Sequence, residues 1–173
     1  MLKNHLCPVC MGYLLDYPQK RLYKKCVTCG FTKECYMIEM KELLNNKYKL
    51  EDQSEEIQNN LNELLDKMNQ VRSLYGKPMV ATSGLRTMED HLRIYAAKGI
   101  IDQSKIPMHS KHLYGLALDI ADGDGSLNQW CKEHEEDLRQ IGIWLEIREG
   151  GWQHFQIRPY ASYTEEKTIF FVP

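Results

Sequence analysis

The chain has 173 residues, of which 43% are hydrophobic, and its formal net charge at pH 7 is −2. This length allows one domain with a moderate core and a small appendage. The weak negative charge argues against a general binder of nucleic acid or anionic membranes. A transmembrane helix needs a run of about 18 apolar residues or more, and the sequence contains none.

Two cysteine pairs lie near the N-terminus, Cys7 with Cys10 and Cys26 with Cys29. Two residues separate the cysteines within each pair and 15 residues separate the pairs, which is the layout of a four-thiolate zinc ribbon. Two disulfides in a secreted domain would give the same spacing, but the N-terminus lacks the pattern of a secretory signal. We therefore expect residues 1–36 to fold around one structural zinc ion, with a short hairpin at 13–23.

Ribbons of this kind dock other proteins, contact nucleic acid or are purely structural, so this segment is a candidate surface for a protein partner. The start of the chain also predicts a protein that is cytoplasmic as synthesised. Any action at the cell wall would then require release by another factor.

Residues 37–50 are predicted to form a helical linker, and residues 51–173 the main domain. That domain begins with a long amphipathic helix. Asp52-Gln53-Ser54-Glu55 resembles a capping box, and apolar residues then recur at helical spacing until Gly76. This apolar stripe is expected to face the core.

The remaining elements alternate between strands and helices. In chain order they are strand 79–82, helix 87–95, strand 116–121, helix 127–140, and strands 143–147 and 152–157. This order predicts an α+β fold with a small antiparallel sheet and flanking helices.

Three potential metal ligands lie in or beside two of these strands. His112 and Asp119 are close in sequence, and His154 follows Asp119 by 35 residues. Gly115 allows the turn that would fold His112 back over the strand at 116–121. Pairing that strand with the one carrying His154 would bring the three side chains to one point. Two His and one Asp suit a catalytic zinc ion and leave a fourth position for water.

The run S-x-H-x-x-G-x-A-x-D at 110–119, followed by W-x-H at 152–154, resembles the zinc peptidases of the D-alanyl-D-alanine carboxypeptidase type. That group includes phage L-alanyl-D-glutamate endolysins and shares its fold with the hedgehog signalling domain. Residues 83–87, S-G-L-R-T, are similar to the S-G-x-R-[ST] segment of the family, and the end of the chain is similar to a phage-encoded branch. The resemblance covers about residues 50–173.

The resemblance implies hydrolysis of peptide bonds in peptidoglycan stem peptides, with zinc held by His112, Asp119 and His154. It also implies that Arg86, with Ser110 nearby, binds a substrate carboxylate in bidentate geometry. D,D-carboxypeptidase and L-Ala-D-Glu endopeptidase activities both fit such a site.

One position departs from the family pattern. Family members usually carry an acidic residue, the general base, three residues before the last His ligand, and here that residue is Gly151. Glu146 and Glu149 are the candidate replacements. If the hairpin closes with an odd-length loop centred on Gly150, Glu146 lies directly across from His154 on the same face. We favour Glu146, and the alternative is that both carboxylates are simply solvated.

A second hypothesis is a non-hydrolytic zinc-binding module of hedgehog-like fold that serves phage assembly or interaction with a host protein. In that case Gly151 marks the loss of the base.

Overall fold

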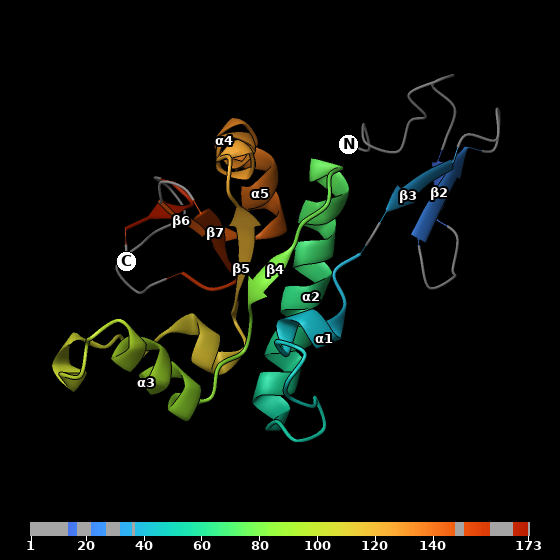
Figure 1. Cartoon of the computed structure of the whole chain (residues 1–173). Coiled ribbons are helices and arrows are strands. Elements are labelled where there is room, and N and C mark those ends of the chain that lie inside the picture. Colours follow the sequence, from blue (N-terminus) through green and yellow to red (C-terminus); the bar gives the residue numbers. More distant parts are fainter. Residues whose placement is uncertain are drawn as a thin grey trace.

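The computed structural model describes residues 14–16, 22–26, 32–35, 37–147, 151–159 and 168–172 (Figure 1). Three short strands precede the main domain: β1 (Leu14–Asp16), β2 (Leu22–Cys26) and β3 (Thr32–Cys35). They form an antiparallel sheet in the order β1-β2-β3. The pairing of β1 with β2 confirms the predicted hairpin, although its second strand runs on to residue 26.

The four cysteines of the predicted ribbon cannot be placed against one another. Cys7, Cys10 and Cys29 lie outside the described residues, and Cys26 is described only by its backbone in β2. The ribbon and its structural zinc ion therefore stay predictions.

The main domain confirms the predicted α+β fold with flanking helices. Its helices are α1 (Met40–Leu43), α2 (Glu55–Tyr75), α3 (Met88–Ala97), α4 (Ser126–Glu133), α5 (Glu135–Ile141) and the short 3-10 helices η2 (Gln103–Lys105) and η3 (Lys111–Tyr114). Its strands are β4 (Ala81–Ser83), β5 (Ala117–Asp122), β6 (Trp144–Glu146), β7 (Gly151–Gln156) and β8 (Phe170–Phe171). None of the described helices has the length and apolar character that crossing a membrane requires.

The five strands form one sheet in the order β4-β5-β7-β6-β8. Neighbouring strands are antiparallel except for β6 and β8, which run parallel, so the predicted antiparallel sheet is in fact mixed. The parallel pair arises because the chain leaves β7 at residue 156 and returns at residue 170 along the outer edge of β6. A tight turn cannot join parallel strands, and here β7 lies between β6 and β8 in the chain. With only two residues, β8 has no sequence periodicity by which to predict it.

Helix α2 confirms the predicted amphipathic helix. The Ser54 hydroxyl accepts a hydrogen bond from the backbone N–H of Ile57, and Gly76 ends the helix with a left-handed φ of 71°. Its buried stripe lies against the sheet and comprises Leu61, Leu64, Met68 and Val71. The predicted stop at Gly76 is confirmed, whereas the helix begins at Glu55 with Ser54 as its N-cap, two residues after the Asp52 with which the expected capping box begins.

The predicted helical linker at 37–50 contains a single helical turn, α1, and packs into the core. Ile38, Leu43 and Leu44 are buried there with the α2 stripe. A linker apart from the domain would leave these apolar side chains in water, and burying them in the core is favourable. Residues 37–50 thus contribute to the same core as the main domain.

The predicted helix at 127–140 is divided into α4 and α5, which meet at His134. His134 has a φ of −119°, outside the helical range. Its ring stacks on Trp130 with centroids 4.5 Å apart, and its Nδ1 lies 2.9 Å from the Trp130 carbonyl oxygen. At the break, the Trp130 carbonyl is thus shared between the His134 ring and the His134 backbone N–H, which lies 3.1 Å from the same oxygen.

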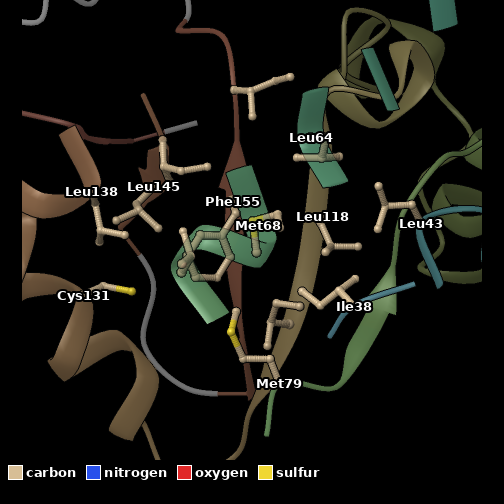
Figure 2. Packing of buried hydrophobic residues seen from close by; sticks show 14 of the residues in the cluster. Ile38, Leu43, Leu64, Met68, Met79, Leu118, Cys131, Leu138, Leu145 and Phe155 are labelled. Atoms are coloured by element: carbon tan, nitrogen blue, oxygen red, sulfur yellow. The ribbon is translucent and has the colours of Figure 1, made fainter. Parts of the chain in front are cut away.

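One face of the sheet forms the core. Leu118, Phe155, Leu145 and Phe170 follow one another across β5, β7, β6 and β8 as paired residues, and all four are buried. Figure 2 shows Met68 of α2 close to Phe155, with Leu138 of α5 and Leu145 nearby. Helices α2 and α5 thus cover this face.

The close packing of Gly84 against Leu43 predicts how a substitution at this position changes stability. A Cβ at Gly84 would overlap the backbone carbonyl of Leu43, whereas a Cβ at Gly123 would have nothing within 4 Å. Gly84→Ala should lower the free energy of unfolding by about 1–3 kcal/mol because the backbone must shift. Gly123→Ala should leave it unchanged or raise it by up to about 1 kcal/mol. Urea unfolding measures both, and equal effects of the two substitutions would contradict the packing.

Candidate metal centre

A row of paired residues crosses the opposite face of the sheet, one position along from the core row. Ser83 of β4 pairs with Asp119 of β5, which pairs with His154 of β7, and Glu146 of β6 pairs with Phe171 of β8. The register of β6 with β7, extended by one residue, sets Glu146 opposite His154. Because side chains alternate between faces, the whole row faces away from the core.

His112 joins this row from η3. Gly115 ends η3 with a left-handed φ of 67°, which confirms the predicted turn, and a Cβ there would lie 2.9 Å from the Leu61 side chain. The turn brings His112 beside Asp119, with Nε2 of His112 3.3 Å from Oδ2 of Asp119. A glycine is therefore needed both for the backbone conformation and for the contact with α2.

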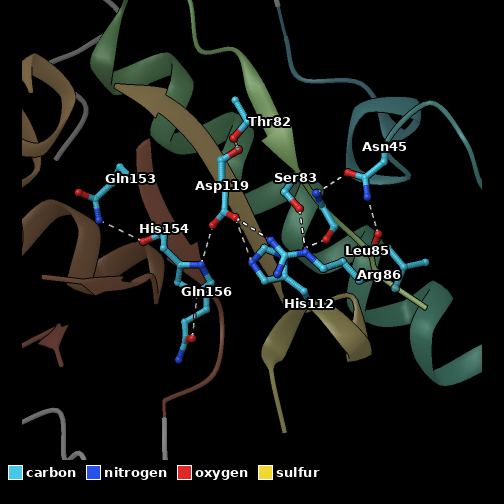
Figure 3. A network of polar contacts seen from close by, with 11 residues as sticks. Asn45, Thr82, Ser83, Leu85, Arg86, His112, Asp119, Gln153, His154 and Gln156 are labelled. Carbon is cyan, nitrogen blue, oxygen red and sulfur yellow. Dashed lines mark hydrogen bonds and ion pairs between the residues drawn. The ribbon is translucent and has the colours of Figure 1, made fainter. Parts of the chain in front are cut away.

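The three predicted ligands do converge. Nδ1 of His154 lies 2.8 Å from Oδ1 of Asp119, so the two histidines flank the carboxylate (Figure 3). One ligand atom from each of His112, Asp119 and His154 lies within 4.8 Å of the other two, and all three residues are buried. The arrangement fits a zinc ion with two nitrogen ligands and one oxygen ligand.

Hydrogen bonds on the far side of each imidazole set its orientation. Nδ1 of His112 lies 2.8 Å from the Gly84 carbonyl oxygen, which can only accept, so Nδ1 carries the proton and Nε2 faces Asp119. Nε2 of His154 lies 3.2 Å from Oε1 of Gln156. The Gln156 amide is itself oriented, because its Nε2 donates to the Arg158 carbonyl at 2.6 Å. In both histidines the outer nitrogen donates and the inner nitrogen is available to a metal.

The electrostatics of the site favour a metal ion over a proton. Burial opposes ionisation of Asp119, but its interactions with the two histidines outweigh burial and hold the pKa of this carboxyl below its usual range. Burial lowers the pKa of His112 and so favours its neutral form. A carboxylate that stays ionised between two buried imidazoles gives a cation one oxygen and two nitrogen ligands, and a metal ion suits this set.

Arg86, predicted to bind a substrate carboxylate, lies beside the three ligands. Its Nη2 is 3.1 Å from Oδ2 of Asp119, and its Nε donates to the Ser83 hydroxyl at 3.0 Å. Its backbone N–H donates to the His112 carbonyl at 3.0 Å. Ser110 is half-buried just before η3, and its hydroxyl does not cap that helix.

The two candidate bases differ in what the structure describes. Glu146 ends β6 in the row of paired residues that also holds Asp119 and His154, whereas Glu149 lies outside the described residues. Burial raises the pKa of Tyr95 in α3; the charge of Arg86 opposes this shift and that of Glu146 adds to it. Tyr95 therefore lies within electrostatic range of both Arg86 and Glu146.

Sequence reasoning did not assign a role to Gln156 or to the Gly84 carbonyl. Gln156 could have been found, because it lies two residues after His154 and so on the same strand face. The Gly84 carbonyl is a backbone group, and no residue type announces it.

The geometry predicts zinc binding by the three ligands. Together with the zinc ion of the predicted ribbon, the wild-type chain should hold two zinc ions, and His112→Ala should hold one because a ligand nitrogen is lost. His109→Ala is the matched control, since His109 is exposed and only three residues away. Metal analysis after gel filtration gives the numbers. An unchanged zinc content in His112→Ala would exclude His112 as a ligand.

A family model described as Peptidase M15 matches residues 37–149, more than half of the chain. The match contains Arg86, His112, Asp119 and Glu146, and the α+β domain with its five-stranded mixed sheet is compatible with a peptidase of this kind. A search of curated proteins and a search of solved structures each gave no match. The match includes His112 and Asp119 of the candidate metal triad and ends before His154, and its extent shows that this chain belongs to the Peptidase M15 family.

Proposed function

We propose that the chain is a zinc-dependent peptidase that hydrolyses peptide bonds in peptidoglycan stem peptides. The observation that carries this proposal is the buried triad of His112, Asp119 and His154, whose inner nitrogens are oriented toward one carboxylate. A zinc ion bound there would supply Lewis acidity that polarises a carbonyl group and acidifies water. D,D-carboxypeptidase and L-Ala-D-Glu endopeptidase specificity both agree with this site.

Glu146 is the residue we propose as general base. Its position on the same sheet face as the metal ligands, opposite His154, suits a carboxylate that takes a proton from the attacking water and passes it to the leaving amine. The conformation of Gly151 supports this relocation. With a φ of 84°, residue 151 adopts a backbone conformation that L side chains rarely adopt, so an acidic residue there would be strained. A glycine is the residue that this backbone conformation favours, which supports a base at another position.

Arg86 is proposed to bind a carboxylate of the substrate, with Ser110 nearby. Its guanidinium already lies at the edge of the triad, 3.1 Å from Asp119, so a carboxylate bound to it would hold the adjoining peptide bond close to the metal ligands. Both a free C-terminal carboxylate and the carboxylate of a D-Glu residue would satisfy this requirement.

The ribbon at residues 1–36 and its structural zinc ion are a separate proposal, supported by the cysteine spacing and by the three-stranded antiparallel sheet. We further propose that this segment docks a protein partner. A phage origin and action at the cell wall are likewise proposals that rest on the sequence resemblance.

The assignment of the base can be tested by substitution. Glu146→Gln should keep its zinc and its fold while kcat on stem peptides falls by roughly 100-fold to 10,000-fold, the usual contribution of general acid–base catalysis. Glu149→Gln is the matched control and should change kcat little. Mass spectrometry of the products gives the rates and also identifies the cleaved bond. The reverse ranking would assign the role to Glu149, and a wild-type protein that binds zinc but cleaves nothing would favour the non-hydrolytic module.

The carboxylate-binding role of Arg86 predicts a change in substrate preference. The wild-type protein should cleave a stem peptide with a free carboxylate far better than its amidated form, because the amide has no charge and one acceptor oxygen. Arg86→Lys should discriminate less between them, since lysine lacks the planar pair of donors. Arg93→Lys, at an exposed arginine of α3, is the control. Equal cleavage of both peptides by the wild type would remove Arg86 from the substrate site.

A further inference from the structure

The hydrogen bonding between β6 and β7 changes beside Glu146. Backbone pairing joins Trp144 with Gln156 and Leu145 with Phe155. At the next position a side chain bridges the strands, because Nε2 of Gln153 lies 2.9 Å from the Glu146 carbonyl and 3.2 Å from the His154 carbonyl. A carboxamide nitrogen carries two hydrogens, so it can donate one to each carbonyl. Gln153 thus joins the strand of the proposed base to the strand of a metal ligand.

The orientation of this bridging amide is fixed from the other side. Nδ2 of Asn128 donates to Oε1 of Gln153 at 2.6 Å, which places the NH2 group toward the two strands. Asn128 is held in turn at the start of α4, where its backbone N–H and that of Leu127 donate to the Asp122 carboxylate, each at 2.9 Å. The bridge therefore connects β6 and β7 to the first turn of α4.

Burial makes the bridge rigid. Gln153 is 0% exposed and Asn128 and Asp122 are buried as well, so water cannot readily replace a lost partner. A buried carbonyl or amide left without a partner costs about 1–3 kcal/mol, which holds all members of this network in one arrangement.

We infer that Gln153 and Asn128 are positioning residues that fix the separation of Glu146 from His154. This inference rests on the proposed function, since it takes Glu146 as the general base. Glu146 is the last residue of β6, where it pairs with Phe171 of β8 on one side and its carbonyl accepts from Gln153 on the side of β7. A misplacement of about 1 Å in a catalytic group can lower the rate about 100-fold, so this bridge matters for turnover.

The test is Gln153→Met, which keeps the length of the side chain and removes its two donors. We expect kcat to fall by about 10-fold to 100-fold, with zinc content and KM close to wild type. In a Glu146→Gln background the same substitution should change the remaining kcat by less than about 3-fold, because there is no longer a base to misplace. A fall in kcat of equal size in both backgrounds would overturn the inference.

Asn69→Leu is the matched control. The Asn69 amide also binds backbone groups, the N–H and carbonyl of Ile38 at 2.9 and 3.1 Å, and Ile38 is not a residue of the site. Its loss should lower stability and leave kcat unchanged. If Gln153→Met does not fold, Asn128→Ala serves instead, because it keeps Gln153 and removes only the donor that orients it. A wild-type kcat in Asn128→Ala would then refute the positioning role.

Hydrogen exchange separates this inference from the proposed function. Peptides covering residues 143–157 should exchange faster in Gln153→Met than in the wild type or in Asn69→Leu, since the strands lose their bridge. This measurement needs no substrate. If the wild type cleaves no stem peptide, the proposed function fails, yet unchanged exchange in Gln153→Met would still refute the bridge on its own.

Discussion

The antiparallel register between β5 and β7 decides both the core and the site of this domain. It sets Leu118 opposite Phe155 on one face and Asp119 opposite His154 on the other. A slip of one residue would move the polar pair into the core and the apolar pair out of it. Since Leu118 and Phe155 are fully buried, the hydrophobic effect strongly opposes that slip. The apolar face of the sheet thereby holds the metal ligands in place.

The same dependence extends to the segment before α2. The Gly84 carbonyl orients His112, and the Gly84 N–H is itself held at 2.5 Å by the side-chain oxygen of Asn45. The nitrogen of that Asn45 amide donates to the Leu85 carbonyl at 2.6 Å (Figure 3). Residues 37–50 therefore support a metal ligand as well as the core, which agrees with a family match that begins at residue 37.

Sequence patterns predicted the parts of the fold that depend on local periodicity and spacing. The apolar stripe and the stop at Gly76 predicted α2, and the alternation around Asp119 and His154 predicted the strand pair and the triad. The two-residue strand β8 and the break at His134 depend on contacts between distant or competing groups, so no local pattern reveals them. For the same reason the bridging role of Gln153 could be found only from the three-dimensional arrangement.

Arg86 links the metal centre to the proposed substrate site through the geometry of its guanidinium. Its Nε and Nη2 are occupied by Ser83 and Asp119, whereas none of the described residues accepts a hydrogen bond from Nη1. A guanidinium has five N–H donors in one plane, so donors remain for a substrate carboxylate while the contact with Asp119 persists. A lysine would have to divide a single ammonium group between both partners. The planar side chain can therefore hold a metal ligand and a substrate at once, which explains why an arginine suits this position.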